Sequence, residues 1–128
     1  MKHILTVLIL AVIAGFSLPT AAAAEAKGKL RHVVSLKFKD GTSAADIKKV
    51  EEAFRALKTK IPQIAVLEWG TNNSPEKHDK GFTHIFILTF NSEADRAVYL
   101  PHPDHKAFGA VLGPVMADVM VLDYWAKD

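Results

Sequence analysis

Hydrophobic and polar residues alternate from Leu30 to Lys39, which is the period of a half-buried β-strand. One face of this segment carries apolar side chains and one histidine, namely Leu30, His32, Val34, Leu36 and Phe38. The strand is predicted to end at Asp40-Gly41, because this pair suits a tight turn. The segment is therefore predicted to be a strand with one face turned toward a core.

A helix is predicted after this turn, because apolar residues then recur three and four positions apart. Ser43 is placed to cap its first turn, with Asp46 three residues further on. The apolar stripe consists of Ile47, Val50, Phe54, Leu57 and Ile61. Pro62 is expected to end the helix, since it lacks an N–H group and clashes with the preceding turn.

The second half of the chain predicts three more strands and two more helices. Strands are expected over residues 64–70, 82–90 and 119–125, with a polar loop over 71–81. Ser92 and Asp95 mark the start of a short helix that reaches about Leu100, and a further helix covers about residues 104–112. The last two strands are apolar on both faces.

The order β-α-β-β-α(α)-β is that of the ferredoxin-like split βαβ fold, an α+β architecture. Its antiparallel four-stranded sheet carries helices on one face only, so the other apolar face would be a large exposed patch. A second copy packed sheet against sheet about a two-fold axis is the simplest cover. We expect a homodimer through the sheet face, with anchors among Trp125, Tyr124, Val121 and Ile85 or Ile87.

Residues 1–24 have the three parts of a secretory signal peptide. Lys2 and His3 precede an apolar run over 4–16, and four alanines at 21–24 provide a cleavage site. The run is shorter than the roughly 20 residues that span a bilayer, so an uncleaved membrane anchor is the less favoured alternative. We expect a polar leader over 25–29, one domain over 30–126, and a periplasmic or secreted protein without stable membrane association.

Composition excludes several classes of protein. Lys+Arg 16 against Asp+Glu 14 is too balanced for a strongly basic nucleic-acid binder. The absence of cysteine rules out disulfides, zinc–thiolate sites, iron–sulfur clusters and thiol nucleophiles. No glycine-rich phosphate loop follows a predicted strand, and no serine has the flanking glycines of a nucleophile elbow. We therefore expect neither a cofactor nor a nucleic-acid partner.

Several segments resemble the stress-responsive α/β-barrel (Dabb) domain family. They are residues 31–39, Trp69-Gly70, residues 81–85, the Tyr-x-x-His-Pro-x-His segment at 99–105, Phe108 and Asp123-Tyr124. The resemblance covers about Leu30 to Trp125, and its most specific part is the Tyr-x-x-His-Pro-x-His segment. It implies a dimeric, ferredoxin-like α/β barrel.

Most members of this family are known by their domain rather than by an activity. The best understood is a plant polyketide cyclase, which closes a linear tetraketide thioester by aldol condensation without cofactor or metal. The resemblance implies that Tyr99 and His105 match its catalytic pair, and that His32 and His84 match histidines of its pocket.

The sequence departs from the cyclase in two places. Val50 and Glu51 replace an aromatic pair of its first helix, although Phe54 keeps an aromatic residue one turn later. Gly113, Pro114 and Met116 stand where the cyclase has bulkier groups. The acyl pocket therefore has a different shape, and the substrate of the cyclase does not transfer to this chain.

The residues themselves also indicate a site of tyrosine and histidine. His32 and His84 alternate in phase with apolar residues, which points both inward. His105 falls in the first turn after Pro103, where the helix dipole disfavours the imidazolium and leaves the neutral ring that a general base requires. Tyr99 is suited to donate a hydrogen bond to a developing enolate oxygen, or to lose its own proton.

Three roles stay open for these residues, so enzymatic activity is undecided. They are cofactor-independent acid–base chemistry of cyclase or lyase type, a non-catalytic ligand pocket, and a structural role in a stress-related dimer. A monooxygenase-like activity is a further alternative that rests on fold analogy alone. No metal site is expected, since His102, Asp104 and His105 have a poor chelating spacing.

A functional cavity, if present, is expected between the helices and the sheet. Tyr99 would be its hydrogen-bond donor and His105 its base, and the other lining residues are predicted to be His32, Val34, Leu36, Phe54, His84 and Phe108. Polar groups that converge in a mostly apolar pocket are typical of a small-molecule site. The predicted ligand is small, uncharged or weakly acidic, and partly aromatic or acyl in character.

Overall fold

The computed structural model describes residues 29–127. The predicted signal peptide, and the leader except for its last residue, lie outside the described residues. The elements follow in the order β1 (Leu30–Phe38), α2 (Ala44–Lys60), β2 (Val66–Thr71), β3 (His84–Phe90), α3 (Glu93–Tyr99), α4 (Pro103–Leu112) and β4 (Met116–Trp125).

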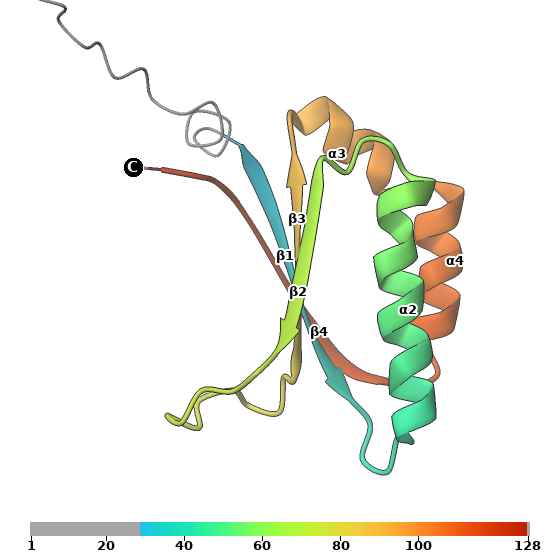
Figure 1. The fold of residues 1–128 in the computed structure, drawn as a ribbon, viewed down its shortest axis with the longest axis vertical. Helices are drawn as coiled ribbons and strands as arrows, with labels where there is room; N and C mark the ends of the chain where they lie inside the picture. Colours follow the sequence, from blue (N-terminus) through green and yellow to red (C-terminus); the bar gives the residue numbers. More distant parts are fainter. Residues whose placement is uncertain (1–28, 128) are drawn as a thin grey trace, which may run out of the picture.

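The strands form one antiparallel sheet in the order β2-β3-β1-β4. Helices α2, α3 and α4 lie on the same face of this sheet, and α2 and α4 run side by side (Figure 1). This arrangement confirms the predicted ferredoxin-like α+β fold with helices on one face.

Side chains cap the start of each helix. Ser43 Oγ accepts the N–H of Asp46 at 3.1 Å, and Ser92 Oγ accepts the N–H of Asp95 at 3.1 Å. Helix α4 begins with Pro103 and is capped by the Nδ1 atom of His102. Each cap satisfies a backbone N–H that has no partner within its helix.

Several predicted boundaries were wrong by one to three residues. Strand β4 begins at Met116 rather than 119, because pairing with Phe38 of β1 extends it past an irregularity at Lys37/Phe38. Strand β3 begins at His84 rather than 82, since the N–H of Phe82 bonds to the carbonyl of Asp79 in a turn. Strand β2 covers Val66–Thr71 rather than 64–70.

The core lies between the helices and the sheet. Helix α2 contributes Val50, Phe54 and Leu57 from its predicted stripe. The facing side chains of the sheet include Leu36 of β1 and Phe86 of β3, both fully buried. Burial of these apolar side chains holds the two layers together.

The predicted dimer anchors lie on two different faces of the sheet, so the set was partly wrong. Val121 pairs with Val34 and Trp125 pairs with Leu30, and residues directly opposite share a face, so both lie on the helix side. Tyr124 alternates with them on β4 and lies on the helix-free side. The other residues on the helix-free side include Ile85, Ile87, Met120 and Leu122.

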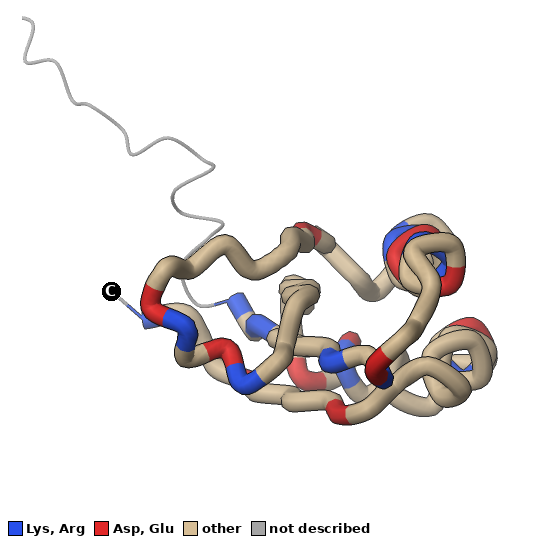
Figure 2. The backbone as a smooth tube through the Cα atoms, turned by 90° about the horizontal axis from the view of Figure 1, so that it is seen from below, with Lys and Arg blue, Asp and Glu red and all other residues tan. Residues whose placement is uncertain are grey.

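Charges of both signs are interspersed along the described chain (Figure 2). On α2 they form short pairs, such as Lys49 with Asp46 at 3.0 Å and Lys48 with Glu52 at 3.8 Å. Within residues 29–127, no helix has the length and apolar character needed to cross a membrane.

Candidate functional site

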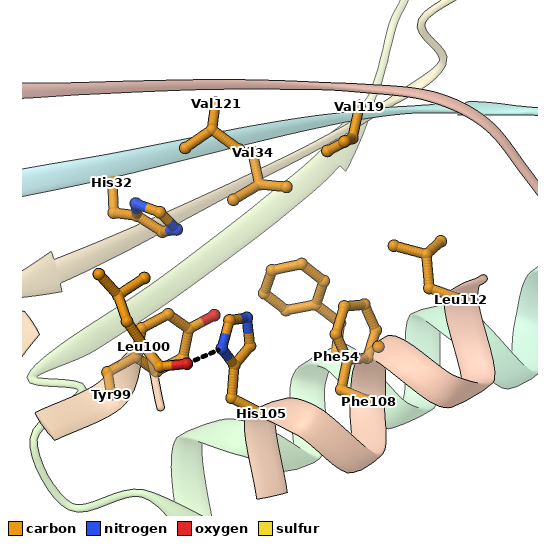
Figure 3. Close-up of a pocket in the computed structure, with 11 residues that line it drawn as sticks. His32, Val34, Phe54, Tyr99, Leu100, His105, Phe108, Leu112, Val119 and Val121 are labelled. Carbon is orange, nitrogen blue, oxygen red and sulfur yellow. Dashed lines mark hydrogen bonds between the residues drawn. The ribbon is translucent and has the colours of Figure 1, made fainter. Parts of the chain in front are cut away.

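A cavity of about 260 Å³ lies where α3 and α4 face β1 and β4 (Figure 3). Its walls are mostly apolar, with a phenol and two imidazoles among them. They consist of His32, Val34, Phe54, Tyr99, Leu100, His105, Phe108, Gly109, Leu112, Val119 and Val121.

The structure brings most of the predicted site residues to this cavity. Among its walls are both members of the predicted acid–base pair, together with His32, Val34, Phe54 and Phe108. Leu36 is fully buried in the core and does not line the cavity. His84 also lies outside its walls.

His84 belongs to a separate polar cluster over β3 and α2. Its Nε2–H donates to Glu51 Oε1 at 2.9 Å, and Thr83 Oγ lies 2.8 Å from its Nδ1. The indole of Trp69 stacks on its ring with centroids 6.2 Å apart. Glu51, which departs from the cyclase pattern, is thus the partner that holds this imidazole.

Tyr99 and His105 form one unit at the corner between α3 and α4. Their rings stack with centroids 4.3 Å apart and an interplanar angle of 29°. The Nδ1–H of His105 donates to the carbonyl of Leu100 at 2.9 Å, because a carbonyl oxygen only accepts (Figure 3). In the neutral ring, Nε2 therefore carries the lone pair that a general base uses.

The Tyr99 phenol is held in its protonated form. Its side chain is buried, and this burial, with a smaller contribution from the Asp123 carboxylate, raises the pKa of Tyr99 well above its usual range. Within residues 29–127 its hydroxyl has no hydrogen-bond partner, and Figure 3 shows it beside the His105 ring at the edge of the cavity. Of the two predicted roles for Tyr99, the geometry favours hydrogen-bond donation.

His32 is the second imidazole of the cavity. Its Nδ1–H donates to Asp123 Oδ1 at 2.7 Å, and Arg96 Nη1 donates to Asp123 Oδ2 at 2.7 Å. Its ring meets that of Tyr99 edge-on, with centroids 5.7 Å apart. Our sequence analysis assigned no role to Asp123 or Arg96, although Asp123 is the only charged residue in the predicted strand over 119–125.

Aromatic and aliphatic side chains form the rest of the walls. Phe54 stacks on Phe86 of β3 at 3.9 Å between ring centroids, and Phe108 meets Phe54 edge-on at 4.6 Å. Val119 and Val121, which the site prediction did not include, enter the cavity from β4. Their alternation along the strand was visible, but only the register of β4 on β1 places them here.

The residues considered for a metal have other contacts. His102 Nδ1 accepts the N–H of Asp104 at 3.1 Å, and His105 Nδ1 donates to a backbone carbonyl. In the part of the chain that the structure describes, no group of three or more His, Cys, Asp or Glu residues is arranged to hold a metal ion.

The fold and the cavity define a ferredoxin-like α+β domain with a mostly apolar cavity whose walls include one phenol and two imidazoles. Residues 30–126 match the model of the Stress responsive A/B Barrel Domain, or Dabb, family. The chain therefore belongs to this family.

Two curated relatives cover most of the chain. The stress-response A/B barrel domain-containing protein HS1 of Arabidopsis thaliana is 36% identical over 100 residues, which are 78% of this chain and 92% of the relative. Olivetolic acid cyclase of Cannabis sativa is 30% identical over 95 residues, which are 74% of this chain and 94% of the cyclase.

Solved structures show the same architecture. A hydroxynitrile lyase from Passiflora edulis superposes with a TM-score of 0.73 at 27% identity, covering 78% of this chain and 94% of the lyase. A protein from Bacteroides fragilis is described as dimeric with a ferredoxin-like fold. It superposes with a TM-score of 0.64 at 26% identity, and the match covers 78% of this chain and 98% of the B. fragilis chain.

Proposed function

We propose that the protein is a cofactor-independent acid–base catalyst of lyase or cyclase type that acts on a small, mostly apolar ligand. The observation that carries this proposal is the stacked pair of Tyr99 and His105 on the wall of a mostly apolar cavity of about 260 Å³. Their ring centroids are 4.3 Å apart. A base and a hydrogen-bond donor on one cavity wall are what proton removal next to a carbonyl requires.

The two side chains have complementary roles in this proposal. His105 Nε2 takes a proton from a hydroxyl or an activated C–H of the ligand, because the Nδ1–H of the ring already donates to the carbonyl of Leu100. Tyr99 donates a hydrogen bond to the oxygen on which negative charge develops, since its raised pKa keeps the phenol protonated. A fixed donor and a fixed base favour the transition state over the bound ligand.

The size and the relatives of the site support this class of reaction. At about 260 Å³ the cavity is slightly below the roughly 300 Å³ of the smallest typical ligand pockets, so the ligand is one aromatic ring or a short acyl chain. Two similar proteins are enzymes by name, one a cyclase and the other a hydroxynitrile lyase.

The test is turnover of an aromatic hydroxynitrile, mandelonitrile, followed by the absorbance of the released benzaldehyde. We expect Tyr99→Phe and His105→Ala each to lower kcat/KM by about 100-fold or more. The matched controls are Tyr124→Phe and His78→Ala, which change residues that do not line the cavity and should keep the rate. A panel of short acyl thioesters is tested for cyclisation with the same variants and controls.

A structural role for the same residues is the second candidate. It is favoured by the near-complete burial of Tyr99 and by its ring contact with Phe90 at 5.2 Å. On this alternative, neither mandelonitrile nor the acyl thioesters are turned over, and Tyr99→Phe and His105→Ala change the free energy of unfolding only. That outcome would overturn the proposed chemistry.

We also propose that the chain forms a homodimer through the helix-free face of the sheet. On β4 this face exposes Met120, Leu122 and Tyr124, each with a relative exposure of 43–58%. The dimeric description of the similar B. fragilis protein supports the same assembly. Sedimentation at low micromolar concentration should give twice the monomer mass, and Leu122→Lys should give the monomer, whereas Val111→Lys on α4 should not.

Export is the remaining part of the proposal. The pattern of residues 1–24 supports cleavage close to Glu25 and a periplasmic or secreted mature chain. The intact mass of protein recovered from the periplasm checks this directly. A mass that retains Met1 to Ala24 would contradict it.

A further inference from the structure

Four residues of the cavity wall are also exposed to solvent, and they mark the mouth of the cavity. Leu100, which follows α3, has a relative exposure of 46%, and Val119 and Val121 of β4 have 39% and 48%. The fourth is Gly109 of α4. The cavity therefore opens between α4 and β4.

Gly109 lies on the cavity face of α4, one turn after the proposed base. Residues four apart on a helix are neighbours, with roughly 5–6 Å between their Cβ atoms, so a side chain at this position would lie beside His105. Phe108, the preceding residue, turns toward α2, where its ring meets that of Phe54 at 4.6 Å. Successive helical residues point about 100° apart. Gly109 is therefore turned away from α2, toward the mouth.

The space beside Gly109 holds no packed atom. A Cβ at this position would have no heavy atom within 4 Å, apart from its chain neighbours and the backbone of its own helix. Its backbone is helical, so no special conformation requires a glycine either. Glycine inside a helix is less favourable than alanine, because it loses more conformational freedom on folding. Neither packing nor backbone geometry therefore explains this residue, and its effect is open space beside the base.

The surface that leads into this space is apolar. Among the eleven described residues of the wall, none is Lys, Arg, Asp or Glu. Val119 and Val121 alternate along β4 on the side that faces the helices, and Figure 3 shows both above the cavity. An apolar chain on these two side chains would leave water, whereas a charged group there would lose its hydration without a partner.

We propose that Gly109 is the specificity-determining residue of this site. Without a side chain it keeps the mouth open beside His105, and it admits ligands whose inner ring or acyl group carries an uncharged apolar tail that lies on Val119 and Val121. The proposal rests on the proposed function and extends its ligand beyond the cavity of about 260 Å³, which holds only the inner group.

The first test measures binding and needs no turnover. The probes are 4-alkylphenols with tails of one to five carbons, titrated calorimetrically into the mature protein. For the wild type, Kd should fall about two- to fourfold with each CH₂ group, since each group leaves water. This dependence on tail length should disappear in Gly109→Leu. Ala110→Leu, which adds bulk at an exposed position of α4 outside the cavity wall, should keep it.

The second test compares stability with affinity in Gly109→Ala. The melting temperature should rise by about 2–5 °C, because alanine is the better helix former and its Cβ meets no packed atom. The affinity advantage of the five-carbon over the one-carbon tail should shrink by about threefold. A glycine kept for packing would give the opposite result, a lower melting temperature with unchanged phenol affinities.

Equal dependence on tail length in the wild type and in Gly109→Leu would overturn the proposal. A wild type that binds none of the phenols, or does not distinguish their tails, would do the same. A dependence that emerges only in Leu122→Lys, the variant designed to be monomeric, would show that a second copy covers the mouth, which also overturns it. Failure of the proposed function is a separate result. A tail dependence that Gly109→Leu removes, in a protein without turnover, would keep Gly109 as the specificity residue of a non-catalytic pocket.

Discussion

Tyr99→Phe separates the chemical role of Tyr99 from its role in packing. It removes one oxygen atom from a side chain whose ring contacts His32, Phe90 and His105. The phenylalanine ring keeps the same shape, so these contacts remain. Only the hydroxyl group that faces the cavity is lost.

The expected cost in stability is small. Within residues 29–127 the Tyr99 hydroxyl has no hydrogen-bond partner, so the substitution breaks no internal hydrogen bond. We expect the free energy of unfolding to change by less than about 0.5 kcal/mol, whereas loss of a buried hydrogen bond costs roughly 1–3 kcal/mol. Tyr99→Ala, which also removes the ring, should cost about 3–5 kcal/mol. Loss of a donor to a developing oxyanion should lower kcat by about 100-fold.

Urea denaturation followed by the fluorescence of Trp69 and Trp125 measures the stability term, with Tyr124→Phe as the matched control. Turnover of mandelonitrile measures the expected loss in kcat. A Tyr99→Phe variant that is destabilised by more than about 2 kcal/mol would show that the hydroxyl is structural. Unchanged turnover in the same variant would refute its role as a donor.

Three further predictions concern the core, a helix cap and alkaline pH. Phe54→Ala should cost about 3–5 kcal/mol in urea denaturation, because it removes a buried ring that stacks on Phe86 at 3.9 Å; a cost below about 1 kcal/mol would contradict this packing. Ser43→Ala should cost about 1 kcal/mol and lower the helical circular dichroism signal, since the cap on the N–H of Asp46 is lost; unchanged stability would show that water replaces it. Because the pKa of Tyr99 is raised from its ordinary value of 10.0, the stability it contributes is fully present below about pH 10 and falls as the pH rises further. The wild type should therefore lose stability above pH 10 more steeply than Tyr99→Phe, and parallel losses would contradict the raised pKa.

Local pattern was enough to predict the elements and much of the candidate site. The stripe of α2, its serine cap and the proline that follows it act within a few residues of one another, and the structure places the helix where they indicate. Tyr99 and His105 are six residues apart across a corner broken by Pro101 and Pro103, so their proximity is also largely a local matter. His32 needed only the alternation of its strand to be placed on the inner face.

Which polar groups meet was decided by the tertiary structure. His84 has the same inward phase as His32, yet the order of the strands places it beneath α2, where Glu51 and not the cavity is its neighbour. Asp123 lies opposite His32 because of the register between β1 and β4, across a separation of 91 residues. Packing of the whole sheet sets such a register, and a shift by one residue would turn Asp123 to the opposite face. Periodicity determines which face of an element a residue occupies, but only the packed sheet determines its neighbour.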